Sequence, residues 1–174
     1  MKQLVIPAAL LLLLAACSST PDKDASAGAP VETRGGPGVA TVTAQGVDSH
    51  NLPAVLTDPN NILSKRSVYF DYDNYEVKAE YKDLVASHAK FLTGNRQFKM
   101  LIQGNTDERG RREYNLALGQ KRADAVKNML ALLGAREDQL EAVSLGEEKP
   151  KNEGHNDDAW AANRRADMLY NGEF

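Results

Sequence analysis

From about residue 64 onward, the spacing of apolar residues changes repeatedly between two periods, and this change constrains the fold more than any other feature. Three segments place an apolar side chain at every second position, which is typical of strands with one buried face: 68–72, 98–102 and 165–170. Residues 140–145 are predicted to form a further strand. Two longer segments repeat apolar residues every three or four positions, which predicts helices: 77–92 and 116–133. Gly94 and Gly134 are in place to end these helices. A short helix is predicted over 157–163.

The predicted order of elements is β-α-β-α-β-(α)-β within roughly 110 residues, the size of one ordinary domain. Helices that alternate with few strands, each having one apolar face, favour two packed layers and a sheet of mixed direction. We therefore predict an α+β fold, a two-layer α/β sandwich built on a mixed four-stranded sheet.

The amino-terminal residues have the features of an export signal. Lys2 precedes an apolar run over 4–16, which is too short to span a bilayer as a mature helix. A buried amino-terminal helix is the less favoured interpretation, because a polar, turn-rich stretch follows at once. Leu-Ala-Ala-Cys over 14–17 resembles the bacterial lipobox, in which the chain is cut before the cysteine. The resemblance implies a signal peptide over 1–16, lipidation of Cys17, and sorting to the outer membrane because Ser18 follows.

Residues 17–58 are predicted to be a flexible tether. They are rich in Ala, Gly, Pro, Ser and Thr and show no sustained apolar period, so they bury too little to offset the entropy of ordering. Asp58 and Pro59 are typical of a helix start, and we place the beginning of the folded domain, 59–174, at this point.

The composition argues against several function classes. The formal net charge is −3, which is unlike the basic balance of nucleic-acid-binding proteins. The sequence has no metal-ligand spacing, phosphate-binding loop or nucleophile with a plausible base, so we predict no metal, no cofactor and no enzyme activity. Cys17 is the single cysteine, which leaves no internal disulfide.

The segment 105–122 contains an acid and a base that are suited to a small zwitterion. Asp107 lies in a polar, glycine-containing loop, and Arg122 lies fifteen residues later in the predicted helix. At 100° per residue, Asn115, Leu118 and Arg122 share one side of that helix, next to its apolar stripe. Asp73 joins them if the first and second strands lie near each other. An Arg fork pairs with a carboxylate, and an Asp accepts from an ammonium.

Five stretches resemble the OmpA-like peptidoglycan-binding domain family: VYFDYDNYEV, GNTDERG, YNLALGQKRADAVKNML, VSLGEEKP and NRRADMLY. They occur in the family's order over about 65–170, behind the lipobox. The resemblance implies an OmpA-like fold that binds peptidoglycan without covalent attachment, through the meso-diaminopimelate of the stem peptide.

Residue roles follow from the resemblance position by position. Asp107 would receive the ammonium of diaminopimelate and Arg122 a carboxylate. Asp73 matches the family's acidic residue after the first strand, and Tyr72 would add a backbone contact. The positions that would line the same pocket are Arg109, Asn115 and Leu118. Close relatives often carry Thr-Pro where this chain has Arg111-Arg112.

The resemblance also implies partners and a location. The chain would be a lipoprotein of the Gram-negative outer membrane, with its domain in the periplasm, working in a Tol-Pal system for cell division and envelope integrity. A TolB-like periplasmic protein would dock on an overlapping surface that includes Glu108 and Arg109. The sequence leaves open an interaction hub for which wall binding is secondary. A peptidoglycan hydrolase using Asp73 and Asp107 is the least favoured alternative.

Other polar residues have structural interpretations. His155, Asp157 and Asp158 are expected to cap and charge the start of the short helix. His88 falls on the apolar stripe of its helix and is predicted to be a core histidine. Arg164 and Arg165 are expected to be one solvated and one ion-paired residue.

Overall fold

The computed structural model describes residues 52–174, so the predicted signal peptide, Cys17 and most of the predicted tether lie outside the described residues. The helices are α1 (Ala54–Thr57), α2 (Lys82–Gly94), α3 (Arg112–Leu132) and α4 (Asp157–Asn163). The strands are β1 (Ser67–Tyr69), β2 (Met100–Asn105), β3 (Leu140–Gly146) and β4 (Arg165–Tyr170). Three 3₁₀ turns cover Ile62–Ser64, Ala79–Tyr81 and Glu137–Gln139. Within 52–174, no helix is both long and apolar enough to cross a membrane.

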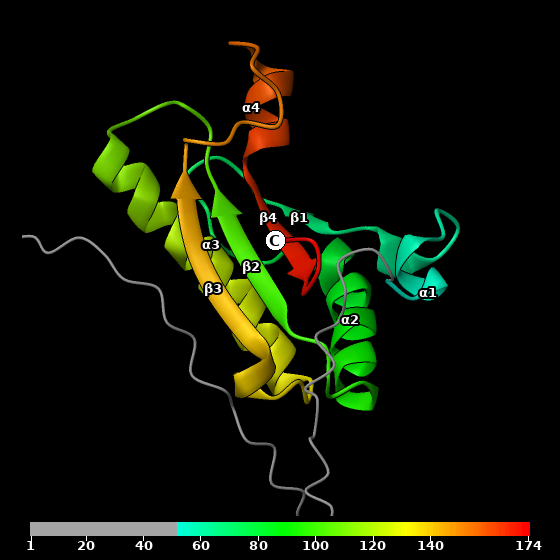
Figure 1. The fold of residues 1–174 in the computed structure, drawn as a ribbon. Coiled ribbons are helices and arrows are strands. Elements are labelled where there is room, and N and C mark those ends of the chain that lie inside the picture. Colours follow the sequence, from blue (N-terminus) through cyan, green and yellow to red (C-terminus); the bar gives the residue numbers. More distant parts are fainter. Residues whose placement is uncertain (1–51) are drawn as a thin grey trace, which may run out of the picture. The chain divides into compact units, whose positions relative to one another are not determined.

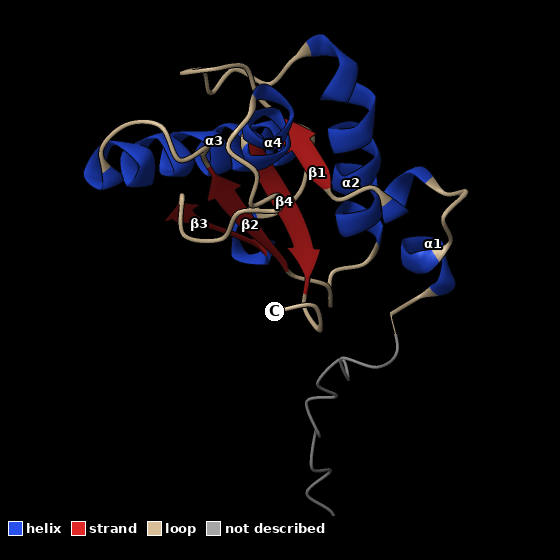
Figure 2. Cartoon of the chain, turned by 90° about the horizontal axis from the view of Figure 1, so that it is seen from above, coloured by secondary structure: helices blue, strands red, loops and turns tan. Residues whose placement is uncertain are grey.

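The four strands form one mixed sheet in the order β1-β4-β2-β3 (Figures 1 and 2). β4 is antiparallel to both β1 and β2, whereas β2 and β3 are parallel. Helices α2 and α3 pack on one face of this sheet (Figure 2). The predicted α+β sandwich with a mixed four-stranded sheet is therefore confirmed.

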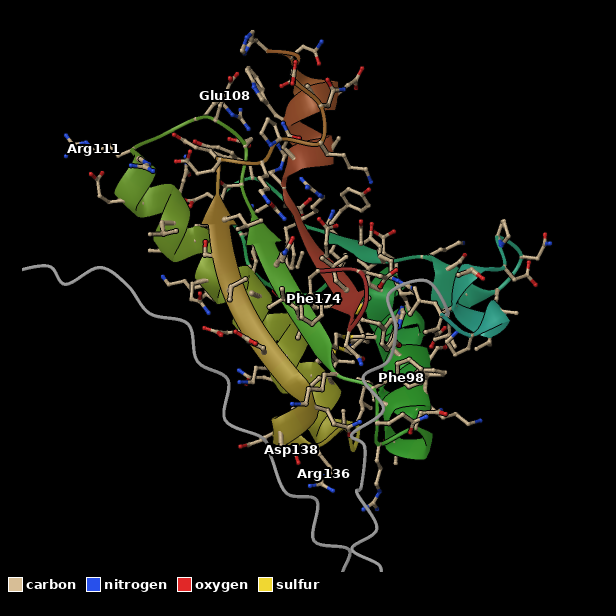
Figure 3. All side chains as sticks on the ribbon, in the orientation of Figure 1. Phe98, Glu108, Arg111, Arg136, Asp138 and Phe174 are labelled. Carbon is tan, nitrogen blue, oxygen red and sulfur yellow. The ribbon has the colours of Figure 1, made fainter. Side chains whose placement is uncertain are left out.

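The register of β4 decides which loops meet. Arg165 pairs with Tyr69 at the end of β1, and Ala166 pairs with Gly104 near the end of β2. The loops that leave β1 and β2 therefore lie at the same end of the sheet as α4, which immediately precedes β4 (Figure 1). Glu108 lies at this end, and Asp138 lies at the opposite end (Figure 3).

The core lies between the sheet and the two long helices. Alternate residues of β4, namely Ala166, Met168 and Tyr170, are fully buried, as the predicted one-sided strand requires. His88 is fully buried as well, and its ring nitrogens lie 2.8 Å from the Tyr170 hydroxyl and 2.9 Å from the Lys65 carbonyl oxygen. The prediction of a core histidine is confirmed.

Two glycines let α3 approach β2 closely. A Cβ atom on Gly104 would lie 1.8 Å from the Gly119 carbonyl oxygen, and one on Gly119 would lie 2.3 Å from Ser144 Oγ. No side chain fits at either position without moving the backbone. This contact fixes the height of α3 above the sheet and therefore the position of its polar residues.

Several details differ from the sequence predictions. The apolar spacing places Leu116 and Leu133 on the buried stripe of the second long helix, but they are 52% and 45% exposed. Leu118 is buried in place of Leu116, and Leu133 lies just past the end of α3. β1 ends at Tyr69, so Tyr72 lies in the following loop and is 62% exposed.

The start of the folded domain also differs from the sequence prediction. Asn61, not Asp58, caps the first turn after Pro59, with its side chain accepting from the Leu63 amide at 2.9 Å. Residues 54–57 were assigned to the tether, yet they form α1, and Leu56 is 2% exposed within the core cluster. Packing thus begins before residue 59.

Candidate functional site

A cavity of about 100 Å³ opens where the loops after β1 and β2 meet the start of α3. All seven residues predicted to bind ligand line it: Tyr72, Asp73, Asp107, Arg109, Asn115, Leu118 and Arg122. Three further residues line it that the sequence did not single out: Thr106, Gly110 and Tyr114. The structure therefore brings together an acid and a base that are fifteen residues apart in the chain.

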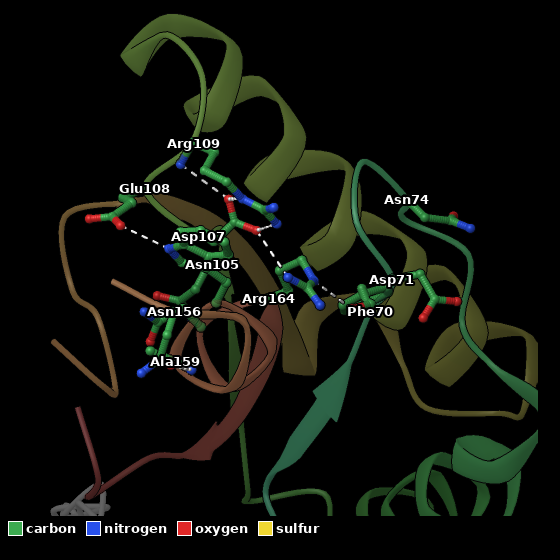
Figure 4. A network of polar contacts seen from close by, with 12 residues as sticks. Phe70, Asp71, Asn74, Asn105, Asp107, Glu108, Arg109, Asn156, Ala159 and Arg164 are labelled. Carbon is green, nitrogen blue, oxygen red and sulfur yellow. Dashed lines mark hydrogen bonds and ion pairs between the residues drawn. The ribbon is translucent and has the colours of Figure 1, made fainter. Parts of the chain in front are cut away.

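Asp107 lies between two arginines (Figure 4). Its Oδ2 atom is 2.8 Å from Arg109 Nη2 and 3.1 Å from Arg164 Nη1. The Arg109 amide also donates to Oδ1 at 3.1 Å. The residue is only 4% exposed, so these contacts supply the hydrogen bonds that a buried carboxylate needs.

Burial alone would raise the pKa of the Asp107 carboxyl, but the hydrogen bonds from Arg109 and Arg164 outweigh it and lower the pKa below its usual range. Asp107 is therefore negatively charged at neutral pH. A fixed negative charge in a small cavity attracts a cationic group.

Arg122, on α3, lines the same cavity and is fully buried. Its guanidinium donates to three backbone carbonyls: Asp71 O at 3.1 Å, Asn74 O at 2.8 Å and Asn105 O at 2.9 Å. These bonds tie the loop after β1 to the end of β2. Burial lowers the pKa of Arg122 to about 10, so the group keeps its charge at neutral pH. Three of the five N–H groups of the guanidinium serve the fold, which leaves two for another acceptor.

Arg109 is held in place from two sides by aromatic rings. Its guanidinium carbon lies 4.2 Å from the ring centroid of Tyr72 and 4.2 Å from that of Trp160. Both distances are in the range of favourable cation–π contacts. Trp160 belongs to α4, so this helix contributes to the site although it lies far from Arg109 in the sequence.

Asp73 reaches the cavity by an unusual backbone conformation. Its φ of 51° is in the left-handed region, which Asp adopts more readily than most residues. The Tyr114 hydroxyl donates to Asp73 Oδ1. We expected Asp73 to join the site through proximity of β1 and β2; β4 lies between those strands, and the loop after β1 reaches the cavity instead.

Asn115 and Leu118 form the wall contributed by α3, and both are buried. The Asn115 amide donates to the Arg109 carbonyl at 3.3 Å and to Glu147 Oε2. Asn115 therefore connects the loop after β2 to the segment after β3, and it fixes the shape of the cavity rim.

Glu108 faces the outside of this loop. Its carboxylate accepts from Trp160 Nε1 at 2.8 Å and lies 2.7 Å from His155 Nδ1. Hydrogen bonds from Trp160 and His155 lower the pKa of Glu108. The predicted partner-surface pair, Glu108 and Arg109, thus contacts α4 through the same tryptophan.

Comparison with known proteins identifies the family. The sequence pattern of the OmpA family matches residues 69–164. A peptidoglycan-associated lipoprotein of Haemophilus influenzae is 41% identical over 157 residues, which cover 90% of this chain and 90% of that protein. The chain belongs to the OmpA family, among the peptidoglycan-associated lipoproteins. A solved peptidoglycan-associated lipoprotein from Burkholderia pseudomallei is 59% identical, with a TM-score of 0.66, over 67% of this chain and 98% of that chain. The carboxy-terminal domain of Helicobacter pylori MotB, at 18% identity and a TM-score of 0.57, shares the fold.

In this OmpA-family chain, the prediction that one of Arg164 and Arg165 is solvated was wrong. Arg164 binds Asp107 and also donates from Nε to the Phe70 carbonyl at 3.2 Å. Arg165 pairs with Asp167 at 2.8 Å. Nothing in the local sequence pattern shows that Arg164 reaches the site, because the contact spans 57 residues and depends on where β4 inserts.

The expected cap of α4 needs one correction as well. Asn156 is the N-cap and accepts from the Ala159 amide at 2.9 Å, while Asp157 and Asp158 lie in the first turn as predicted. His155 contacts Glu108 instead of capping the helix. Within residues 52–174, no group of three or more His, Cys, Asp or Glu side chains is arranged to hold a metal ion.

Proposed function

We propose that the domain binds the stem peptide of peptidoglycan without covalent attachment, by gripping the free end of meso-diaminopimelate. The observation that carries this proposal is that Asp107 and Arg122, both buried and of opposite charge, line one small cavity. An amino-acid head group presents an ammonium and a carboxylate, which need these two partners. The names of the family relatives, peptidoglycan-associated lipoproteins, support the same ligand class.

In the proposed complex, the ligand ammonium approaches Asp107 by replacing hydrogen bonds that Arg109 makes. Arg164 also contacts Asp107, from the side of β4, so the carboxylate keeps one protein partner throughout. The ligand carboxylate takes the two N–H groups of Arg122 that do not serve the backbone. Asp73, Tyr72, Asn115 and Leu118 enclose the head group.

Recognition fits this site better than catalysis. A glycosidase needs a carboxylic acid whose pKa is raised so that it can donate a proton. Hydrogen bonds from two arginines lower the pKa of Asp107 instead, and the Asp73 carboxylate already accepts a hydrogen bond from the Tyr114 hydroxyl. We therefore propose a binding role in place of the hydrolase that the sequence left as an alternative.

The cellular role follows from joining the site to the predicted leader. Lipidation at Cys17 would anchor the chain to the outer membrane, and the domain in the periplasm would hold that membrane to the wall as part of a Tol-Pal system. A TolB-like protein would dock beside the cavity, where Glu108 is exposed and Arg109 is half-buried. Because Arg109 belongs to both surfaces, wall and protein partner are expected to compete.

The test is co-sedimentation of the full-length chain with isolated sacculi. We expect Asp107→Asn to abolish retention, since it removes the charge that receives the ammonium. Asp138→Asn is the matched control: Asp138 also pairs with an arginine, Arg136, but at the opposite end of the sheet (Figure 3). Equal retention of the wild type and Asp107→Asn would contradict the proposal.

A competition experiment distinguishes the proposed wall-binding role from the alternative of a protein-interaction hub. If soluble stem peptide releases a bound TolB-like protein, the two ligands share the site, as proposed. Additive binding of both would place the protein partner on another face.

A further inference from the structure

Thr106 is among the residues that line the cavity, and its hydroxyl group takes no part in the contacts described above. The residue directly follows β2, and its amide donates to the Gly146 carbonyl at 2.8 Å, which fixes the backbone. The residue is 3% exposed and lines the same cavity as Asp107 and Arg122. Its Oγ1 atom has no hydrogen-bond partner in the part of the chain that the structure describes.

A buried hydroxyl without a partner destabilises a fold, because it has lost its hydrogen bonds to water. Four buried side-chain atoms lack a partner within residues 52–174, and Thr106 is the one of their residues that lines this cavity. The position tolerates a β-branched side chain, so valine would fill the same space without the penalty. A hydroxyl at this position is therefore explained best by a hydrogen-bond partner that a bound ligand supplies.

The charges around the hydroxyl indicate which ligand group would be its partner. Of the two cations that line the cavity, Arg109 is paired with Asp107, whereas Arg122 contacts no carboxylate within residues 52–174. Arg122 Nη1 binds the Asn105 carbonyl, the group immediately before Thr106 in the chain. A carboxylate seated against Arg122 has about four acceptor positions, more than two free N–H groups can fill.

We infer that the Thr106 hydroxyl donates a hydrogen bond to the ligand carboxylate that Arg122 receives, and so selects diaminopimelate over lysine. Lysine at the same place in a stem peptide carries the ammonium but lacks this second carboxylate. The inference rests on the proposed function, because it concerns the same ligand and the same cavity.

The experiment is calorimetric titration of the full-length chain with two synthetic tripeptides that differ only in meso-diaminopimelate or lysine at the third position. Thr106→Val should raise the Kd for the diaminopimelate peptide roughly 10- to 100-fold, the effect of losing a hydrogen bond to a charged group. Thr106→Ser keeps the hydroxyl and should bind within about threefold of the wild type. The weaker Kd for the lysine peptide should be the same in the wild type and in Thr106→Val.

Thermal unfolding without ligand separates this role from a structural one. We expect Thr106→Val to have a Tm equal to or above that of the wild type, because it removes a buried group without a partner. A lower Tm would show that the hydroxyl serves the fold, and unchanged peptide affinity would show that it does not contact the ligand; either result overturns the inference. If the wild type itself fails to bind the diaminopimelate peptide, the proposed function fails instead.

Discussion

The Arg109 guanidinium holds Asp107 through two contacts, with Nη2 2.8 Å from Oδ2 and Nε 3.2 Å from Oδ1. The chain thus places its own cation on the carboxylate that we propose for the ligand ammonium. The rings of Tyr72 and Trp160 keep this cation in position. In the proposed complex, the ligand ammonium therefore displaces the Arg109 guanidinium from Asp107, and this changes the surroundings of the Trp160 ring.

Trp160 is the single tryptophan of the chain, so tryptophan emission reports on the surroundings of this one indole ring, which include Arg109. We expect the emission to change when a diaminopimelate tripeptide is titrated, because Arg109 leaves the position 4.2 Å from the indole ring. Asp107→Asn should show no such change at the same peptide concentrations. A saturating titration without any change in wild-type emission would mean that Arg109 stays in place.

Replacing Arg122 is predicted to damage the fold as well as the site. Arg122→Lys should lower the free energy of unfolding by about 2–4 kcal/mol, because one ammonium cannot reach the three carbonyls that the planar fork bonds. Urea denaturation measures this loss. A cost below about 1 kcal/mol would show that the carbonyls find other partners. For this reason, loss of peptide binding in an Arg122 variant supports a role in the site only if the variant is also shown to be folded.

The sequence predicts the elements well and the long-range contacts of the site poorly. Alternation over 165–170 and the acidic start at 157 give β4 and α4 correctly, because these signals are local. Arg164 and Trp160 escape prediction because their partners, Asp107 and Arg109, lie more than fifty residues away. Only the insertion of β4 between β1 and β2 brings α4 to the loop after β2.

The placement of side chains on α3 shows a second limit. The spacing correctly puts Asn115, Leu118 and Arg122 on one side of the helix, but it assigned Leu116 to the core. The Gly104–Gly119 contact sets how α3 rotates against the sheet, and it turns Leu118 and Arg122 inward. An apolar period does not contain that information.

The same glycine contact makes a stability prediction. Gly104→Ala should lower the free energy of unfolding by at least about 3 kcal/mol or prevent folding, because its Cβ would meet backbone atoms. Gly94→Ala is the control: it also lies at the end of an element, and its Cβ would meet nothing within 4 Å. Circular dichroism during thermal unfolding of both variants tests the prediction. Equal Tm values would contradict the close approach of α3 and β2.

His88 predicts how stability depends on pH. Burial lowers the pKa of His88 to about 4, below its usual value of 6.5. Between these two values the unfolded chain binds a proton that the folded chain does not, so stability falls as the pH is lowered through this window. We expect this group to cost roughly 2 kcal/mol between about pH 7 and about pH 5.

The measurement is urea unfolding at both pH values for the wild type and His88→Gln. The variant should be less stable at about pH 7, because it loses the contacts with Tyr170 and Lys65, but it should lose less on acidification. Other groups contribute equally to both proteins, so the difference isolates His88. Parallel losses in the two proteins would contradict a buried neutral imidazole.

The most direct test of the account is a crystal structure of the chain soaked with a meso-diaminopimelate tripeptide. We predict that the ligand ammonium lies within hydrogen-bond distance of Asp107 Oδ2, with the carboxylate on Arg122 and Arg109 displaced from Asp107. A peptide bound elsewhere, or a head group in the cavity with the Arg109–Asp107 pair intact, would contradict it.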